Sequence, residues 1–262
     1  MSIPITCYLW RDEADLPRIL NLVHQMPLAC PHAIDLLWRL SALHREDDRA
    51  AAFWENSNGQ VIGFAACQFP WATLDFFVLS GDTAQRVTAD LFARARFRFQ
   101  ERKEQRLYCV EYRDDDHARD QVVQAEGFVE EEDHYAWFER PLAKLPPAPS
   151  LPDQFTLRPL AGESEVAAYA EAHRAAFQSL SMTPAWRARV LRTLSYRPAL
   201  GLAVTAPDGS IAGLCVSWFD PSRRVAQIEP MGGIHVFSGR AWGVSFCWRS
   251  FTDSKSKEPY VR

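Results

Sequence analysis

Three short apolar runs follow one another in the second half of the chain. Residues 201–206, 211–219 and 225–231 are rich in Val, Ile, Leu and Phe, and turns containing Pro, Asp, Gly or Ser separate them. Apolar runs of this length between turn residues predict an antiparallel meander of three strands. Pro230 interrupts the third run. Because proline has no N–H to donate to a ladder, it predicts a bulge or strand end beside Glu229.

The first half of the chain carries the same pattern at an offset of about 150 residues. The run Asn58–Phe64 matches Asp208–Leu214, and both runs continue to a phenylalanine. Between the halves, residues 145–152 hold four prolines, which predict an extended linker. We therefore expect a tandem repeat of one fold, with domains at 1–144 and 153–262.

The period of the apolar positions predicts the other elements. In the first domain we expect strands at 6–10, 50–55, 61–68, 72–79, 107–112 and 134–140, and helices at 14–24, 33–43, 83–104 and 117–125. In the second domain, strand 155–158 precedes helices at 163–177 and 184–194, the latter with Thr183 as its N-cap. The predicted class is α/β (α+β), with a mixed, mostly antiparallel sheet flanked by helices in each domain.

Composition narrows the function classes. The chain has 262 residues and a net charge of -4, without a Lys/Arg tract, so no nucleic-acid partner is expected. Its six cysteines form no CxxC pair and show no ligand spacing with the seven histidines, so neither a disulfide framework nor a metal site is expected. The absence of an apolar leader or an 18-residue apolar run predicts a cytoplasmic protein that does not insert into membranes.

The end of the meander, Glu229–Gly232, with the glycine-containing loop after it, resembles the GNAT (GCN5-related) acyl-CoA N-acyltransferases. Residues 155–231 resemble most closely the second half of tandem GNAT proteins related to mycothiol synthase. The resemblance implies acetyl-CoA as co-substrate, with its pantetheine arm on the fourth strand and its pyrophosphate in the next loop. The implied acetyl-CoA contacts are Pro230, Met231, Gly232, Ser238, Gly239, Arg240, Ala241, Trp242 and Gly243.

The reaction that the resemblance implies is transfer of an acetyl group to a primary amine of a small molecule or peptide, by direct attack in a ternary complex. Glu229 stands where the family places a general base, which removes the proton from the amine. Alternatively, Glu229 is a strand-end carboxylate paired with Arg223 or Arg224. The first two helices of a GNAT domain overhang the acceptor, so six side chains either line its pocket or form packing and solvent faces: Trp186, Arg187, Arg189, Arg192, Tyr196 and Arg197.

The first domain departs from the family at the pyrophosphate loop. GNAT proteins have a Gln/Arg-x-x-Gly-x-Gly/Ala motif there, because several backbone amides must turn toward the anion at a helix N-terminus. This chain has Ser80–Gln85, with one glycine and an aspartate. We expect a degenerate copy, in which Asp82 or Thr83 is the N-cap of the following helix.

The second domain departs from the family after Gly232. About thirty residues remain where the first domain suggests some 60, and residues 244–262 show no clear helical stripe. If the codons from about residue 233 are regrouped one base earlier, permitted synonyms give a Gln-x-x-Gly-x-Gly loop aligned with Ser238–Gly243. We therefore hypothesise that this stretch is out of frame and that the second domain is truncated.

Two classes of function follow. One is an N-acetyltransferase; the other is a catalytically inactive GNAT-fold binding protein or truncated remnant. An unfinished second sheet would leave apolar strands such as 211–219 partly uncovered, which favours a homodimer.

Overall fold

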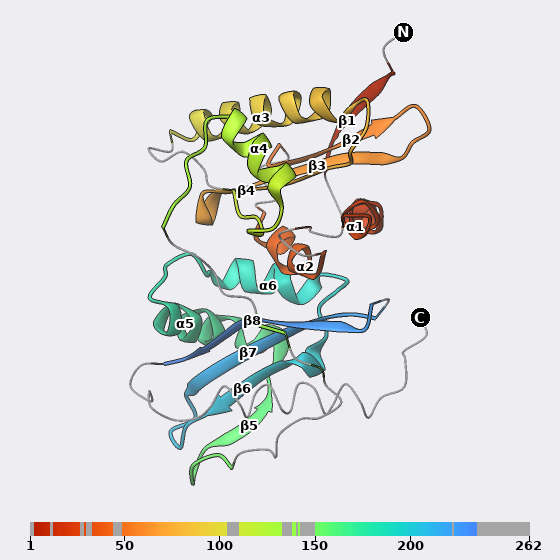
Figure 1. Cartoon of the computed structure of the whole chain (residues 1–262). Coiled ribbons are helices and arrows are strands. Elements are labelled where there is room, and N and C mark those ends of the chain that lie inside the picture. The colour runs from red at the N-terminus through yellow and green to blue at the C-terminus, as the bar shows by residue number, and fades with distance from the viewer. Residues whose placement is uncertain are drawn as a thin grey trace. The chain divides into compact units, whose positions relative to one another are not determined.

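The computed structural model describes residues 3–10, 13–26, 29, 33–43, 49–103, 110–132, 138–139, 141, 150–221 and 223–234 (Figure 1). The chain divides into two compact units, Met1–His134 (unit 1) and Tyr135–Arg262 (unit 2). Each unit contains a four-stranded antiparallel sheet with helices packed against it. The predicted mixed α/β class is confirmed. Most of the linker 145–152 and of the strand predicted at 134–140 lies outside the described residues.

In unit 1, the sheet lies between two pairs of helices: α3 and α4 are on one side, and α1 and α2 are on the other (Figure 1). Leu74 and Phe76 of the sheet pack with Leu91 and Phe92 of α3 in the apolar core. The strands, in sheet order, are β1 (Ile5–Leu9), β2 (Ala51–Asn56), β3 (Val61–Gln68) and β4 (Thr73–Val78). The helices are η1 (Glu13–Asp15), α1 (Leu16–His24), α2 (Ala33–Ala42), η2 (Phe69–Trp71), α3 (Ala84–Glu101) and α4 (His117–Ala125).

Of two local predictions for unit 1, one is wrong over its described residues and the other, the N-cap position of α3, is confirmed. Val110–Tyr112, the described part of the strand expected at 107–112, is not in a strand. In this segment the Tyr112 side chain donates a hydrogen bond to Asp120 of α4 at 2.7 Å. Helix α3 begins after Thr83 as expected, but the Thr83 side chain makes no capping hydrogen bond.

In unit 2, α5 and α6 lie on the same side of the sheet (Figure 1). Thr183 caps α6 as predicted, since its Oγ1 accepts a hydrogen bond from Trp186 N at 3.1 Å. The strands, in sheet order, are β5 (Thr156–Pro159), β6 (Gly201–Thr205), β7 (Ile211–Asp220) and β8 (Val225–Gly233). The helices are η3 (Gly162–Glu165), α5 (Val166–Phe177), α6 (Pro184–Arg192) and η4 (Pro198–Leu200).

The burial of β7 corrects one expectation. Every residue from Ile211 to Trp218 is buried, so this strand is not partly uncovered as the sequence suggested. The argument for a homodimer from an exposed β7 therefore falls, although the oligomeric state itself stays a prediction.

The two sheets repeat one irregularity. The pairing of β2 with β3 shifts between Trp54 and Glu55, and the pairing of β6 with β7 shifts between Val204 and Thr205. The two sites are separated by 204 − 54 = 150 residues, which is the offset that the sequence repeat predicts.

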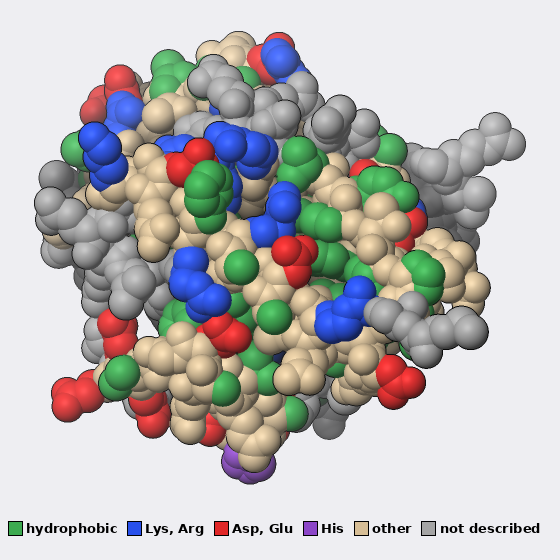
Figure 2. All heavy atoms as spheres, turned by 90° about the horizontal axis from the view of Figure 1, so that it is seen from above, with side chains coloured by type: hydrophobic (Ala, Val, Ile, Leu, Met, Phe, Trp, Pro, Cys, Tyr) green, Lys and Arg blue, Asp and Glu red, His purple; other side chains and the backbone are tan. Residues whose placement is uncertain are grey.

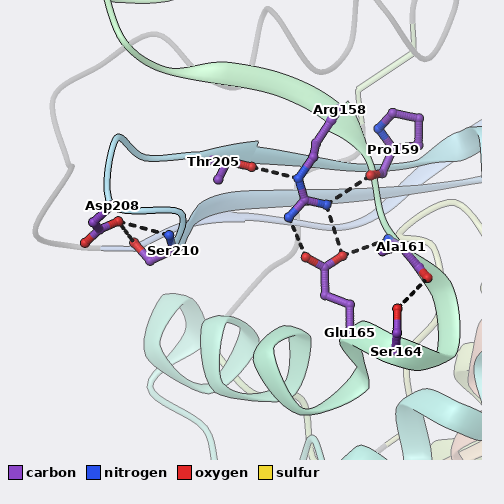
Figure 3. A network of polar contacts seen from close by, with 8 residues as sticks. All are labelled: Arg158, Pro159, Ala161, Ser164, Glu165, Thr205, Asp208 and Ser210. Carbon is purple, nitrogen blue, oxygen red and sulfur yellow. Dashed lines mark hydrogen bonds and ion pairs between the residues drawn. The ribbon is translucent and has the colours of Figure 1, made fainter.

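An ion pair at the start of unit 2 ties its first helical segment to the sheet (Figure 3). Arg158 of β5 donates from Nε to Thr205 Oγ1 at 2.9 Å and from Nη1 to Glu165 Oε2 at 3.1 Å. The same Glu165 oxygen accepts from Ala161 N at 2.7 Å. Glu165 directly precedes α5, so these contacts fix where α5 begins over the sheet.

The surface of unit 1 that carries α3 mixes basic and acidic side chains (Figure 2). In the described parts of the chain, no helix is long and apolar enough to cross a membrane. Over the same residues, no group of three or more His, Cys, Asp or Glu side chains is placed to hold a metal ion.

Candidate functional site

Strand β8 bulges at the position where proline predicts it. The ladder pairs Cys215 with Met231 and Ser217 with Ile228, so the dipeptide Glu229–Pro230 stands opposite a single residue of β7. Two residues against one define a β-bulge, which interrupts the ladder and bends the strand. The prediction of a bulge beside Glu229 is confirmed, and the ladder resumes at Met231.

A buried tryptophan holds the bulge in place. Trp218 of β7 is 1% exposed, and its Nε1–H donates a hydrogen bond to the backbone carbonyl of Glu229 at 2.7 Å. The ring of Tyr196 packs edge-on against Trp218, with centroids 6.2 Å apart. The bulge takes the Glu229 carbonyl out of the ladder, and the buried Trp218 side chain supplies its hydrogen bond instead. Neither Trp218 nor this contact was predicted from the sequence.

Helix α5 closes over β8 just after the bulge. A Cβ on Gly232 would lie 2.9 Å from Phe177 Cζ and 3.0 Å from Ala176 Cβ, closer than side chains normally approach. A side chain at this position would therefore force the Phe177 ring and Ala176 to shift. Beside it, Met231 is 40% exposed, whereas Glu229 is half-buried.

The inner side of α5 presents a row of rings at helical spacing. The centroids of Tyr169 and His173 are 6.1 Å apart, and those of His173 and Phe177 are 4.6 Å apart. Burial lowers the pKa of His173 to about 4, and the positive charge of Arg187 acts in the same direction. His173 is therefore neutral at physiological pH.

Arg187 of α6 is enclosed by two tyrosines. It is 2% exposed, its Nη2 donates to Tyr196 Oη at 2.9 Å, and its guanidinium lies 3.9 Å from the Tyr169 ring centroid. Burial raises the pKa of Tyr169; the charge of Arg187 lowers it, and that of Glu229 raises it. Tyr169 thus lies within electrostatic reach of both the arginine and the carboxylate at the bulge.

Unit 1 has a different arrangement at the matching place. Asp75 of β4 pairs with Ala66, which corresponds to Val216 opposite the bulge because 66 + 150 = 216. Asp75 is 2% exposed and accepts hydrogen bonds from Arg39 Nη1 at 2.9 Å and Gln68 Nε2 at 3.0 Å. Burial raises the pKa of Asp75 to about 6, and the Arg39 charge offsets this only in part.

Arg39 also donates from Nη2 to Glu111 Oε2 at 2.6 Å. Burial alone would lower the pKa of Arg39, but the carboxylates of Asp75 and Glu111 outweigh burial and raise it. The pKa of Asp75 is raised as well, which for a carboxyl disfavours the charged form, because burial of that carboxylate outweighs the attraction of an arginine that it shares with Glu111. Sequence reasoning missed this network, although a single Asp in an apolar strand and an Arg in an apolar helix were signals for it.

The structure brings four of the predicted site residues together on β8: Glu229, Pro230, Met231 and Gly232. The other six, Ser238, Gly239, Arg240, Ala241, Trp242 and Gly243, lie outside the described residues. Of the α6 side chains, Arg187 is in the core, whereas the Arg192 side chain is 68% exposed and paired with Glu163 at 3.0 Å. Arg192 therefore belongs to the solvent face.

Comparison with known proteins identifies the fold. No protein-family model and no curated protein matches the sequence. A GCN5-related N-acetyltransferase from Sphaerobacter thermophilus aligns with a TM-score of 0.59 and 17% identity, over 97% of this chain and 85% of its own. A tandem GNAT protein from the clavulanic acid biosynthesis pathway aligns with a TM-score of 0.61 and 16% identity, over 100% of this chain and 88% of its own.

A third similar structure is the GCN5-related glucosamine N-acetyltransferase region of a fungal multi-domain GH3 β-N-acetylglucosaminidase. It aligns with a TM-score of 0.53 and 13% identity, over 98% of this chain and 34% of its own. At these identities the likeness is one of fold. The chain has the GNAT fold that its sequence predicts, and the finer resemblance to mycothiol synthase stays a prediction.

Proposed function

We propose that this protein is an N-acetyltransferase that moves an acetyl group from acetyl-CoA to a primary amine of a small molecule or peptide. The GNAT fold supports the reaction class. The observation that carries the proposal is the bulge at Glu229–Pro230, which opens the β7·β8 ladder beside a half-buried carboxylate. Trp218 donates a hydrogen bond to the Glu229 carbonyl within this bulge.

The chemistry follows from the groups at the bulge. The acceptor ammonium gives a proton to the Glu229 carboxylate, directly or through water, and its freed lone pair attacks the thioester carbonyl carbon. The tetrahedral intermediate collapses by breaking the C–S bond, and the second proton of the attacking nitrogen is lost in this step and passes, directly or through water, to the departing CoA thiolate. Backbone N–H groups of β8 near Met231 are suited to meet the oxyanion, while Pro230 has none to offer.

Acetyl-CoA would bind along β8 at Pro230, Met231 and Gly232, with the loop 238–243 around the pyrophosphate. This assignment rests on the family resemblance, as does the hypothesis that residues from about 233 are read out of frame. The DNA that encodes residues 228–262 tests that hypothesis. The hypothesis is supported if insertion of one missing nucleotide restores a reading frame that encodes Gln-x-x-Gly-x-Gly. It is refuted if the DNA sequence encodes residues 233–262 as they stand.

The experiment that tests the proposed reaction is release of CoA thiol in the presence of acetyl-CoA and a panel of amines. Glu229→Gln keeps the shape of the side chain but cannot accept the proton, so we expect kcat to fall by about 100-fold or more. Acetyl-CoA affinity should stay within about 3-fold, because the backbone of β8 is unchanged. Glu163→Gln, an exposed Glu in the same unit, is the matched control and should leave kcat unchanged.

Two results would contradict the proposal in different ways. A Glu229→Gln variant as active as the wild type would remove Glu229 as the base. Absence of both acetyl-CoA binding and thiol release with every amine would favour the non-catalytic binding protein or remnant.

A further inference from the structure

The row of rings on α5 runs alongside the bulge of β8, the strand that this helix contacts (Figure 1). At one end of the row, Phe177 lies against Gly232, where an added Cβ would be 2.9 Å from the Phe177 Cζ. At the other end, Tyr169 lies within electrostatic reach of Glu229. The helix over 169–177 and the strand over 229–232 both span about 10 to 12 Å. His173, halfway along the row, therefore lies over the middle of the bulge.

The bulge lacks one backbone donor at this point. In the proposed reaction the thioester carbonyl oxygen gains negative charge, and hydrogen-bond donors aimed at that oxygen stabilise the transition state. A strand supplies such donors from its N–H groups, but Pro230 has no N–H. A donor for the oxyanion beside Pro230 therefore has to come from another element.

His173 has the properties of such a donor. It is half-buried: its Nδ1 is enclosed and has no hydrogen-bond partner among the described residues, whereas its Nε2 is neither enclosed nor bonded to them. Its pKa of about 4 leaves the imidazole neutral, with one N–H. An enclosed N–H without an acceptor is rarer than an enclosed acceptor without a donor, so the proton belongs on Nε2.

We propose that the Nε2–H of His173 donates a hydrogen bond to the thioester carbonyl oxygen of acetyl-CoA and stabilises the oxyanion that forms when the amine attacks. The electron pair of the C=O double bond moves to this oxygen as the N–C bond forms, and it returns as the C–S bond breaks. His173 keeps its proton throughout, because a neutral imidazole gives a hydrogen bond without giving up its proton. This inference rests on the proposed acetyl transfer and adds a catalytic residue to it.

The kinetic test removes the donor and keeps the ring. His173→Phe leaves an aromatic side chain between Tyr169 and Phe177, and we expect kcat to fall by about 100-fold or more, as for the loss of one oxyanion donor. KM for acetyl-CoA should change by less than about 3-fold, since the hydrogen bond strengthens only in the transition state. His117→Phe, at an exposed histidine of unit 1, is the matched control and should leave kcat unchanged.

Two further variants separate the donor from the packing of the ring. His173→Gln keeps a neutral N–H donor, so it should retain more of the wild-type kcat than His173→Phe does. His173→Leu, a smaller apolar side chain, carries the same prediction as His173→Phe and replaces it if that variant does not fold.

A spectroscopic measurement on bound acetyl-CoA separates this inference from the proposed function. Infrared difference spectra of acetyl-CoA with an isotope label at the thioester carbonyl report hydrogen bonding to that oxygen, and they need no amine. The carbonyl band of the bound ligand should lie at lower wavenumber in the wild type than in His173→Phe. In His173→Gln it should lie closer to the wild-type position.

The outcomes distinguish the two proposals. A lower carbonyl band in the wild type than in His173→Phe supports the hydrogen bond even if no amine is acetylated. Transfer with equal kcat in both proteins and an unchanged band overturns the role of His173 and leaves the acetyltransferase standing. A fall in kcat with an unchanged band also overturns the hydrogen bond, because a purely structural role of the ring gives that result.

Discussion

Asp75 gives a prediction that depends on burial and charge alone. It is 2% exposed, and its pKa rises from 3.8 to about 6 because burial outweighs the attraction of Arg39 and the hydrogen bond from Gln68. A carboxyl with a raised folded-state pKa contributes stability that is fully present below the unfolded pKa and is lost as the pH rises through about 6. The difference between the two pKa values corresponds to about 3 kcal/mol.

Asp75→Asn removes this titration and keeps the size of the side chain. The free energy of unfolding is measured by denaturant titration for both proteins at several pH values, so that all other titrations cancel in the difference. The wild-type value minus the variant value should fall by about 2 to 3 kcal/mol between about pH 4 and about pH 8. Asp82→Asn, at an exposed aspartate of the same unit, is the matched control and should give a constant difference within about 0.5 kcal/mol.

The sign of the change with pH in this stability difference tests the argument about Asp75 burial. A difference that rises with pH would mean that the ion pair with Arg39 outweighs the cost of burying the Asp75 charge. A constant difference would mean that Asp75 is not enclosed as the structure shows.

Other predictions concern unit 2. Gly232→Ala places a Cβ about 3 Å from α5 atoms and should lower the unfolding free energy by about 1 to 3 kcal/mol, whereas Gly233→Ala, with 4.0 Å of space, should cost less in the same denaturant titration. Trp218→Phe leaves the Glu229 carbonyl without its hydrogen-bond donor, so we expect a similar loss of unfolding free energy and a higher KM for acetyl-CoA. An unchanged KM would show that this hydrogen bond does not contribute to acetyl-CoA binding. Thr183→Ala should cost about 1 kcal/mol of unfolding free energy, and Thr83→Ala, which loses no capping bond, should cost less; equal losses would contradict the capping assignment.

The sheets were predictable because their signals are local. β3 has the predicted bounds, Val61–Gln68, since turn residues flank an uninterrupted apolar run. The start of α5 was less accurate: the predicted helix begins at 163, whereas α5 begins at Val166 after a 3-10 turn. The reason lies outside the helix, because the Glu165 side chain bonds Arg158 and Ala161 N in place of a regular first turn.

The candidate site was predictable only in part. The missing N–H of Pro230 is a property of one residue, so the bulge could be inferred from the sequence. The contacts of Trp218 with the Glu229 carbonyl and of Arg187 with two tyrosines depend on which polar atoms meet once helices and strands pack. Periodicity tells which side of an element a residue is on, but not which partner it finds there.

Acetyl-CoA binding tests the central claim most directly. Isothermal titration of the purified chain with acetyl-CoA should show saturable binding in the micromolar range, weakened in Trp218→Phe because that variant loosens the bulge in β8. A folded wild-type chain that takes up no acetyl-CoA would contradict the account and leave the GNAT fold without its reaction.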